Sequence, residues 1–324
     1  MIAKVIAQML LTFSVLNILP VDAGNLEWKI GIPTAPNALA ASMISLTSNP
    51  MSLPVAADRF PPPKKTDLSS YGVVTDAQSV FVADTQSGAA LFAKNADDVR
   101  SIGSITKLMT ALVFLDSKPD FKKWVNVIDD DYVGGAHVNL NFNDGIRVKD
   151  ILGASIVGSD NTATKALSRL SGLSPADFII AMNAKAKELG MTSSAFVEVT
   201  GIDSGNVSTA RDLMLLLAEA KRHPELVAYM TSSDVSVTQA SGETKFITST
   251  DMLFDSLINK KPYAIVAGKT GYIPEAGYCF ITMIDHDGDE IFVAVLGAST
   301  KEDRFNDAKA IAVWAFDTFT WPKL

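Results

Sequence analysis

The sequence predicts a mixed α/β fold of the α+β type, in which an antiparallel β-sheet is flanked by helices and joined to a mostly helical subdomain. Three observations predict it. Segments rich in β-branched and aromatic residues occur on both sides of the domain, at about residues 73–94 and 263–324. Between them, at about residues 104–225, the apolar pattern is helical. Strands at both ends with helices between them indicate one sheet with a helical insertion.

Strands are expected in a hairpin near the start of the domain and in a run near its end. Residues 79–84 and 89–94 flank the turn-forming residues 85–88. Three further strands are expected at residues 263–270, 276–284 and 290–298. Residues 306–319 form the predicted closing helix, with apolar side chains on or near one face.

Helices dominate the middle of the chain. Residues 104–116 are apolar on nearly every side, which is typical of a helix buried inside a domain. Ser174 and Pro175 supply a cap and a first-turn proline for one of the following helices, and Gly190 stands where that helix would end. These further helices are expected at residues 148–158, 162–170, 175–189 and 210–222.

The N-terminal part of the chain reads as an export signal followed by a linker. Residues 1–23 contain Lys4, an apolar stretch at 5–19, and a Val-x-Ala ending that is typical of a signal-peptidase site. An uncleaved N-terminal anchor is the alternative. Residues 24–66 are rich in Pro, Ser and Ala and show no sustained periodicity, which indicates a flexible linker or propeptide. Residues 67–324 are then the folded domain.

Composition excludes several classes of function. The net charge is -8, which makes nucleic acid an improbable partner. The single cysteine, Cys279, rules out an intramolecular disulfide, and its strand-like surroundings favour a small packed residue. No cluster of His, Cys or carboxylate residues has metal-ligand spacing, so neither a metal nor another cofactor is expected.

Three short strings in a fixed order point to nucleophilic catalysis by a serine. They are Ser-Ile-Thr-Lys at residues 104–107, Ser-Asp-Asn at 159–161 and Lys-Thr-Gly at 269–271. Alone, the first string could be a helix-capping serine followed by a lysine whose stem reaches the surface. The second has a rival at residues 204–206, but that rival lies in a loop rich in turn formers, whereas Ser159 opens a helix. The ordered trio favours the catalytic reading.

The residue types in these strings suit acyl transfer without histidine. Ser104 and Lys107 are three positions apart, so both project from one helix face. Lysine can accept a proton only when neutral, which requires burial and a second cation, for which Lys269 is the candidate. Ser159 can pass a proton to a leaving amine, and Asn161 can hold Lys107 or a substrate amide.

The third string suits recognition of an extended peptide. Gly271 follows a predicted strand and permits close approach of a peptide backbone. Lys269 and Thr270 can bind a carboxylate. Backbone N–H groups near Ser104 and just after Gly271 can stabilise an oxyanion.

These strings, with their flanking residues, resemble the low-molecular-mass penicillin-binding proteins of the D-alanyl-D-alanine carboxypeptidase and endopeptidase type. These are serine peptidases that act on peptidoglycan and have the penicillin-binding/β-lactamase-like transpeptidase fold. The resemblance extends from about residue 77 to 319. It includes SIGSITKLMT at 101–110, TGID at 200–203, STARDL at 208–213, GKTGY at 268–272 and EAGYC at 275–279.

The resemblance implies a role for each matching residue. Ser104 would be acylated with Lys107 as base, and Ser159 with Asn161 would complete the proton relay. The backbone of Ser104 and Tyr272 would form the oxyanion hole.

The resemblance also implies the substrate contacts. Lys269, Thr270, Gly271 and Tyr272 would contact the substrate, and Arg304 would lie near its carboxylate. For Arg304, a surface arginine that caps the last helix remains an alternative. Peptidoglycan stem peptides and cross-links would be the substrates, and β-lactam antibiotics would acylate the enzyme.

Location and substrate preference are less constrained. Many carboxypeptidases of the family continue into a second domain and an amphipathic membrane helix, whereas this sequence stops at Leu324. We therefore expect a periplasmic enzyme with no stable membrane anchor, closer to the endopeptidases. A class A β-lactamase is one alternative, although neither Glu198 nor Glu225 lies in the E-x-x-L-N string of that family. A non-catalytic peptidoglycan-binding scaffold is the other.

Overall fold

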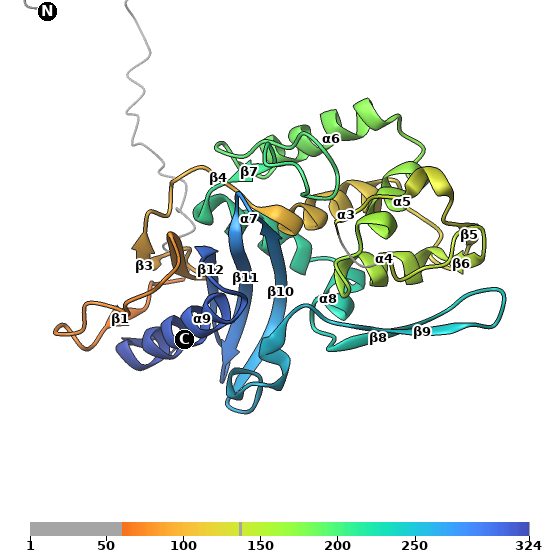
Figure 1. The fold of residues 1–324 in the computed structure, drawn as a ribbon. Coiled ribbons are helices and arrows are strands. Elements are labelled where there is room, and N and C mark those ends of the chain that lie inside the picture. Colours follow the sequence, from red (N-terminus) through yellow and green to blue (C-terminus); the bar gives the residue numbers. More distant parts are fainter. Residues whose placement is uncertain (1–59, 136–137, 324) are drawn as a thin grey trace, which may run out of the picture. The chain divides into compact units, whose positions relative to one another are not determined.

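A five-stranded antiparallel sheet forms the centre of the computed structural model, which describes residues 60–135 and 138–323 (Figure 1). These residues belong to one unit of the chain, residues 54–324. The predicted signal peptide and most of the predicted linker lie outside the described residues. The strand order is β10 (Tyr263–Ile273), β11 (Gly277–His286), β12 (Asp289–Ala298), β2 (Ser79–Asp84) and β3 (Ala90–Lys94).

Both faces of the sheet are buried, as strand β12 shows most directly. Its side chains alternate along the strand between two apolar clusters. Phe292 and Ala294 belong to the cluster shared with the helical subdomain, whereas Val293 and Val295 belong to the cluster under the last helix. This alternation follows from the two-residue period of a β-strand, so the fold has helices, sheet and helix in three layers.

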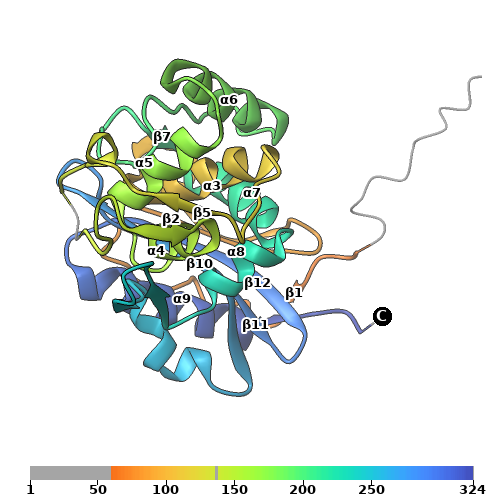
Figure 2. The same cartoon turned by 90° about the vertical axis from the view of Figure 1, so that its right-hand side faces the viewer.

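The helical subdomain covers one face of the sheet and the C-terminal helix covers the other. Helix α9 (Lys301–Thr318) packs on strands β11 and β12, while helix α7 contacts β12 from the opposite side (Figures 1 and 2). The helical subdomain contains α3 (Thr106–Asp116), α4 (Val148–Ile156), α5 (Asn161–Leu170), α6 (Pro175–Glu188), α7 (Ala210–Lys221) and α8 (Pro224–Met230).

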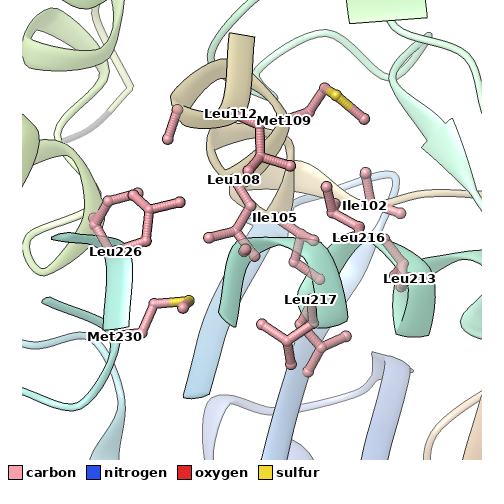
Figure 3. Close-up of a cluster of buried hydrophobic side chains, with 14 of the residues drawn as sticks. Ile102, Ile105, Leu108, Met109, Leu112, Leu213, Leu216, Leu217, Leu226 and Met230 are labelled. Carbon is pink, nitrogen blue, oxygen red and sulfur yellow. The ribbon is translucent and has the colours of Figure 1, made fainter. Parts of the chain in front are cut away.

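Helix α3 is the buried helix that the sequence predicts. Figure 3 shows its apolar side chains, together with those just before it, facing leucines of α7 and the apolar residues of α8. Leu108 and Met109 are fully buried in this cluster, and the neighbouring Lys107 is also fully buried. An ammonium group at such a site loses its hydration, which affects its protonation.

The main helices and strands agree with the prediction, whereas some bounds differ and several shorter elements were not predicted. Helix α9 begins at Lys301 rather than 306, because the Thr300 hydroxyl caps it by accepting from the Asp303 N–H at 3.0 Å. Helix α8 and the hairpin of β8 (Asp234–Thr238) and β9 (Thr244–Thr248) were not predicted. The residues of β1 (Lys64–Lys65) fall within the predicted linker, yet they pair with β13 (Phe319–Thr320).

The four remaining short strands make two small pairs outside the central sheet. They are β4 (Arg100–Ser101) with β7 (Val207–Ser208), and β5 (Trp124–Asn126) with β6 (Gly145–Arg147). Within the described ranges, no helix is both long and apolar enough to cross a membrane.

Candidate active site

The predicted nucleophile lies on a tight turn at the start of α3. Ser104 is in the short 3-10 helix η2 (Gly103–Ile105), which leads directly into α3. Gly103 has φ of +54°, and a Cβ there would lie 2.6 Å from the backbone N of Tyr272. Only glycine fits this position, because it tolerates positive φ and leaves room for the neighbouring strand. The turn therefore brings the backbone before Ser104 against the end of β10.

Lys107 points its amine at the Ser104 hydroxyl. The Nζ–Oγ distance is 2.9 Å, and Nζ also donates to Asn161 Oδ1 and to the Thr200 carbonyl, each at 2.6 Å. Burial lowers the pKa of Lys107 from 10.5 to about 7, against the opposing charges of Glu198 and Asp160. Burial, one of the two causes that the sequence suggested, is thus the main cause of the shift. Near neutral pH, a large fraction of the amine is free to accept a proton.

The second string sits at the start of α5, where its middle residue is the cap. The Asp160 carboxylate accepts from the Ala163 N–H at 2.9 Å, and its other oxygen accepts from the Asn139 N–H at 2.7 Å. Ser159 has φ of +55°, an uncommon conformation for a residue other than glycine. Asn161 follows as the first helical residue, and its Nδ2 donates to the Gly134 carbonyl at 2.9 Å. This bond leaves Oδ1 facing Lys107.

The third string lies near the end of strand β10. Lys269 Nζ donates to Ser159 Oγ at 3.0 Å and to the Thr270 carbonyl at 3.1 Å. Burial, with repulsion from Lys107 and Arg304, holds the pKa of Lys269 well below its usual range. The Thr270 and Thr250 hydroxyls are 2.5 Å apart and share a hydrogen bond. The three strings therefore converge on one site.

Gly271 lines the cleft and also permits close approach of another backbone segment of the protein. A Cβ at Gly271 would lie 2.2 Å from the Ile102 carbonyl oxygen, so the glycine accommodates the backbone before Ser104. A Cβ at Gly201, which has φ of +89°, would lie 2.0 Å from the Gly103 carbonyl oxygen. Glycines from three separate segments thus bring the nucleophile turn, strand β10 and the loop at 200–206 into backbone contact.

Arg304 is buried beside the cleft, so the surface-arginine alternative is wrong. Only 4% of it is exposed, and Nη1 donates to the carbonyls of Gly271 at 3.2 Å and Cys279 at 3.3 Å. Its guanidinium carbon is 5.5 Å from the Tyr278 ring centre. Burial lowers the pKa of Arg304 to about 10, which leaves it charged at neutral pH. It therefore adds positive charge where the cleft meets α9.

An open cleft of about 320 Å³ passes in front of these groups. Its lining includes Ser104, Ser159, Asn161, Thr270, Gly271, Tyr272 and Arg304 from the sequence prediction. Sequence reasoning missed other lining residues, among them Gly135, Ser249, Thr250 and Lys301. Ser249 and Thr250 follow strand β9 and reach the cleft through tertiary packing, for which the sequence carries no local signal. Lys301 is detectable only once the Thr300 cap is recognised.

The cleft has the character of an anion-binding catalytic site. Arg304 and Lys301 supply cationic groups to the lining, and a serine hydroxyl faces a lysine whose pKa is near neutral. The predicted substrate residue Lys269 is buried and is not part of the lining. In the part of the chain that the structure describes, no group of three or more His, Cys, Asp or Glu residues could hold a metal ion. The rival string at residues 204–206 has a different use, because Asn206 bonds the loop and Thr106 rather than Lys107.

Comparison with known proteins agrees with this geometry. The family model described as D-alanyl-D-alanine carboxypeptidase matches residues 67–300, which is more than half of the chain. A D-alanyl-D-alanine endopeptidase of Pseudomonas aeruginosa is 33% identical over 276 residues, covering 84% of this chain and 87% of the relative. An Escherichia coli protein of the same description is 32% identical over 238 residues, covering 73% and 76%.

A solved structure extends the similarity to three dimensions. Penicillin-binding protein D2 from Listeria monocytogenes, in its cefotaxime-bound form, superposes with a TM-score of 0.65 at 31% identity. The match covers 76% of this chain and all of that one.

Proposed function

The chain belongs to the D-alanyl-D-alanine carboxypeptidase family and is a serine DD-peptidase, and we propose that Ser104 is its nucleophile and Lys107 its base. The observation that carries this proposal is the 2.9 Å contact between Lys107 Nζ and Ser104 Oγ, combined with a lysine pKa of about 7. A neutral amine has two N–H bonds and one lone pair. Asn161 Oδ1 and the Thr200 carbonyl each accept a hydrogen bond from one of the two N–H groups, so the lone pair faces the Ser104 hydroxyl.

Acylation follows from this arrangement. Lys107 takes the Ser104 proton as Oγ attacks the carbonyl carbon of the scissile D-alanyl peptide bond. The bond to the leaving amine then breaks, and the amine receives the proton held by Lys107 through the Ser159 hydroxyl, which returns Lys107 to its neutral form. Lys269, which donates to Ser159 Oγ, orients that hydroxyl. In hydrolysis water attacks the acyl carbon, Lys107 accepts the water proton, and Ser104 Oγ leaves and takes that proton back, which regenerates the free enzyme.

The backbone on each side of the nucleophile turn is proposed to stabilise the oxyanion. The donors are the N–H groups of Ser104 and Tyr272, which belong to the two segments that Gly103 and Gly271 allow into contact. The carboxylate of the terminal D-amino acid binds the cationic end of the cleft. Arg304 provides the charge there, and the Thr270 hydroxyl, held by Thr250, provides a hydrogen bond. Lys269, which is buried outside the lining, contributes through its bond to Ser159.

We propose endopeptidase cleavage of peptidoglycan cross-links as the main reaction, with carboxypeptidase action on uncross-linked stem peptides as the second activity. Support comes from the two relatives at 32–33% identity, both described as D-alanyl-D-alanine endopeptidases. β-Lactams are proposed to acylate Ser104, by analogy with the cefotaxime-bound relative. Nucleic acid is not a proposed partner.

Export to the periplasm is part of the same proposal. A peptidase of peptidoglycan needs access to the cell wall, and residues 1–23 have the composition of a signal peptide. The proposed mature protein then consists of the 24–66 segment and the catalytic domain at 67–324, although the structure includes Lys64 and Lys65 in the fold.

Labelling with a fluorescent penicillin tests the nucleophile. We expect a stable adduct on the wild-type protein, mapped to Ser104 by mass spectrometry, and none on Ser104→Ala. Ser101→Ala is the matched control, because Ser101 is close in sequence but its hydroxyl bonds the Ser204 carbonyl. An adduct that persists in Ser104→Ala would refute the assignment, and rapid turnover of the drug would indicate a β-lactamase.

Digestion of purified muropeptides tests the substrate preference. Conversion of cross-linked dimers to monomers supports the endopeptidase proposal. Release of free D-alanine from monomers, with dimers left intact, would overturn it in favour of a carboxypeptidase. Labelling without either product would refute the proposed peptidoglycan substrate.

A further inference from the structure

Glu198 is not among the residues that line the substrate cleft, and its carboxylate accepts four hydrogen bonds. One oxygen accepts from the Thr200 N–H at 2.6 Å and from the Thr200 hydroxyl at 2.8 Å. The other accepts from Asn206 Nδ2 at 2.7 Å and from the Gly201 N–H. An ionised carboxylate has about four acceptor sites, and all four are filled here. Four donors to one carboxylate hold the loop at 198–206 in a single shape.

This loop supplies the carbonyl that holds the amine of Lys107. Thr200 is almost fully buried, and its carbonyl oxygen accepts from Lys107 Nζ at 2.6 Å. Glu198 binds both the N–H and the hydroxyl of that same Thr200. The carbonyl that orients the amine therefore belongs to the residue that donates two of the four hydrogen bonds to this carboxylate.

A second link joins the same carboxylate to the start of α3. Asn206 is fully buried, and its Nδ2 donates to Glu198 Oε1 and also to Thr106 Oγ1 at 3.2 Å. Thr106 directly precedes Lys107 in the helix. The Asn206 Oδ1 accepts from the N–H groups of Val197 and Glu198, so the amide has little freedom to turn. Glu198 is thus tied to Lys107 through both the loop carbonyl and the helix.

We propose that Glu198 is a positioning residue for the base: it holds the Thr200 carbonyl against Lys107 and so aims the amine at Ser104. The proposal rests on the assignment of Lys107 as base. Glu198 is not itself in the cleft lining, and its four acceptor sites are taken, so it has no spare oxygen with which to activate water. Its part therefore differs from that of the deacylating glutamate of class A β-lactamases.

The charge of Glu198 also affects when Lys107 is neutral. Among the described residues, the charged groups that act on Lys107 are Glu198 from the loop, Asp160 at the start of α5 and Lys269 from β10. The two carboxylates favour the ammonium form and so raise the pKa of Lys107, in opposition to burial. Removal of the Glu198 charge lowers that pKa, so the amine stays neutral to a lower pH. A purely structural role would leave the pH dependence unchanged.

The test measures the acylation rate with a fluorescent penicillin from pH 5 to 9 on three variants. For Glu198→Gln, which keeps the shape but loses the charge, we expect a roughly tenfold or greater fall in the plateau rate. The acidic limb of the pH profile is the part in which the rate rises with pH, and its midpoint should move to lower pH by about half a unit or more. For Glu198→Asp, which keeps the charge but shortens the side chain, the plateau should fall while the limb stays within about 0.2 units of wild type.

Asp203→Asn is the matched control, because it removes the same charge from the same loop. Its carboxylate accepts only from the Gly205 N–H, an interaction that an asparagine oxygen can keep. This variant should show the wild-type plateau and limb. Thermal unfolding of every variant separates loss of rate from loss of fold.

The outcomes are distinct. A Glu198→Gln limb that coincides with wild type, whatever its plateau, would overturn the proposal, and so would a Glu198→Asp limb displaced like that of Glu198→Gln. If Glu198→Gln does not fold, Glu198→Asp decides: a reduced plateau at wild-type thermal stability supports the proposal, and an unchanged plateau refutes it. Absence of an adduct on the wild-type protein would instead refute the proposed function itself.

Discussion

The rate of acylation of Ser104 should rise with pH in a single step whose midpoint is near pH 7. The cause is the burial that lowers the pKa of Lys107 from 10.5 to about 7, because only the neutral amine can accept the serine proton. The neutral fraction is then about one in eleven at pH 6 and about ten in eleven at pH 8, so the rate should increase about tenfold across this interval. A solvent-exposed lysine would be neutral in only about one molecule in 2,500 at pH 7.

Substitution of the base should slow acylation strongly and should abolish the rise in rate near pH 7. Arginine at position 107 stays charged throughout this pH range, so Lys107→Arg should acylate at least about 100-fold more slowly, with no midpoint near 7. Lys185→Arg is a suitable control, because the Lys185 amine pairs with Asp116 at 3.0 Å, outside the cleft. It should keep the wild-type profile.

The assay measures the second-order rate constant for covalent labelling. The reaction is quenched at set times, and the adduct is quantified by gel fluorescence at half-unit pH steps. A hydrolytic substrate gives the same limb only if acylation limits turnover, so labelling is the cleaner readout. A midpoint above 9 would refute the claim that burial neutralises Lys107. A wild-type rate in Lys107→Arg at pH 7 would refute its role as the base.

Three further predictions test the glycine contacts, the carboxylate site and a buried acid. Gly201→Ala should lower the free energy of unfolding by more than about 2 kcal/mol, because its Cβ would lie 2.0 Å from a carbonyl oxygen. Gly172→Ala, at φ of +84° with open space around it, should cost only about 1 kcal/mol; equal losses in urea denaturation would contradict the steric argument. Arg304→Met should reduce kcat/KM by about ten- to a hundredfold for peptides with a free terminal carboxylate, but far less for their carboxamides; equal losses on both would exclude carboxylate binding. Burial raises the pKa of Asp251 from 3.8 to about 6, so the folded state binds more protons than the unfolded state between these values, and stability falls as pH rises through them. Asp251→Asn should therefore add up to about 3 kcal/mol at pH 7 and almost nothing at pH 4, and a gain of the same size at both pH values would argue against this linkage.

The sequence was informative wherever the signal was local. The choice of Ser159 over the rival serine at 204 rested on helix-start chemistry, and the structure accordingly has Asp160 as the cap and Asn161 on Lys107. The burial of the helix after Ser104 followed from its composition. Strands β2, β11 and β12 were predicted within one or two residues of their observed bounds, because apolar and β-branched runs end at turn formers.

What could not be predicted depends on contacts between distant segments. Glu198 has no local signature, and its importance appears only when Thr200, Asn206 and the start of α3 are seen together. The contact between Gly271 and the backbone of Ile102 could not be predicted for the same reason, because Ile102 is far away in the chain. The β8–β9 hairpin carries short, largely exposed strands whose apolar pattern is weak.

The chemistry of the Ser104–Lys107 pair is therefore a property of the tertiary fold rather than of the short string that contains it. In an isolated helix, Lys107 would be hydrated and charged, and its amine could not accept a proton from Ser104 at neutral pH. In the fold, the amine of this α3 residue bonds to Asn161 of α5 and to the Thr200 carbonyl of the loop. Loosening any of these three segments would readmit water and return the lysine to its charged form. Acylation should then be lost before the sheet unfolds, because the site depends on the contact between the loop and the helices, whereas the sheet is held by its own two apolar clusters.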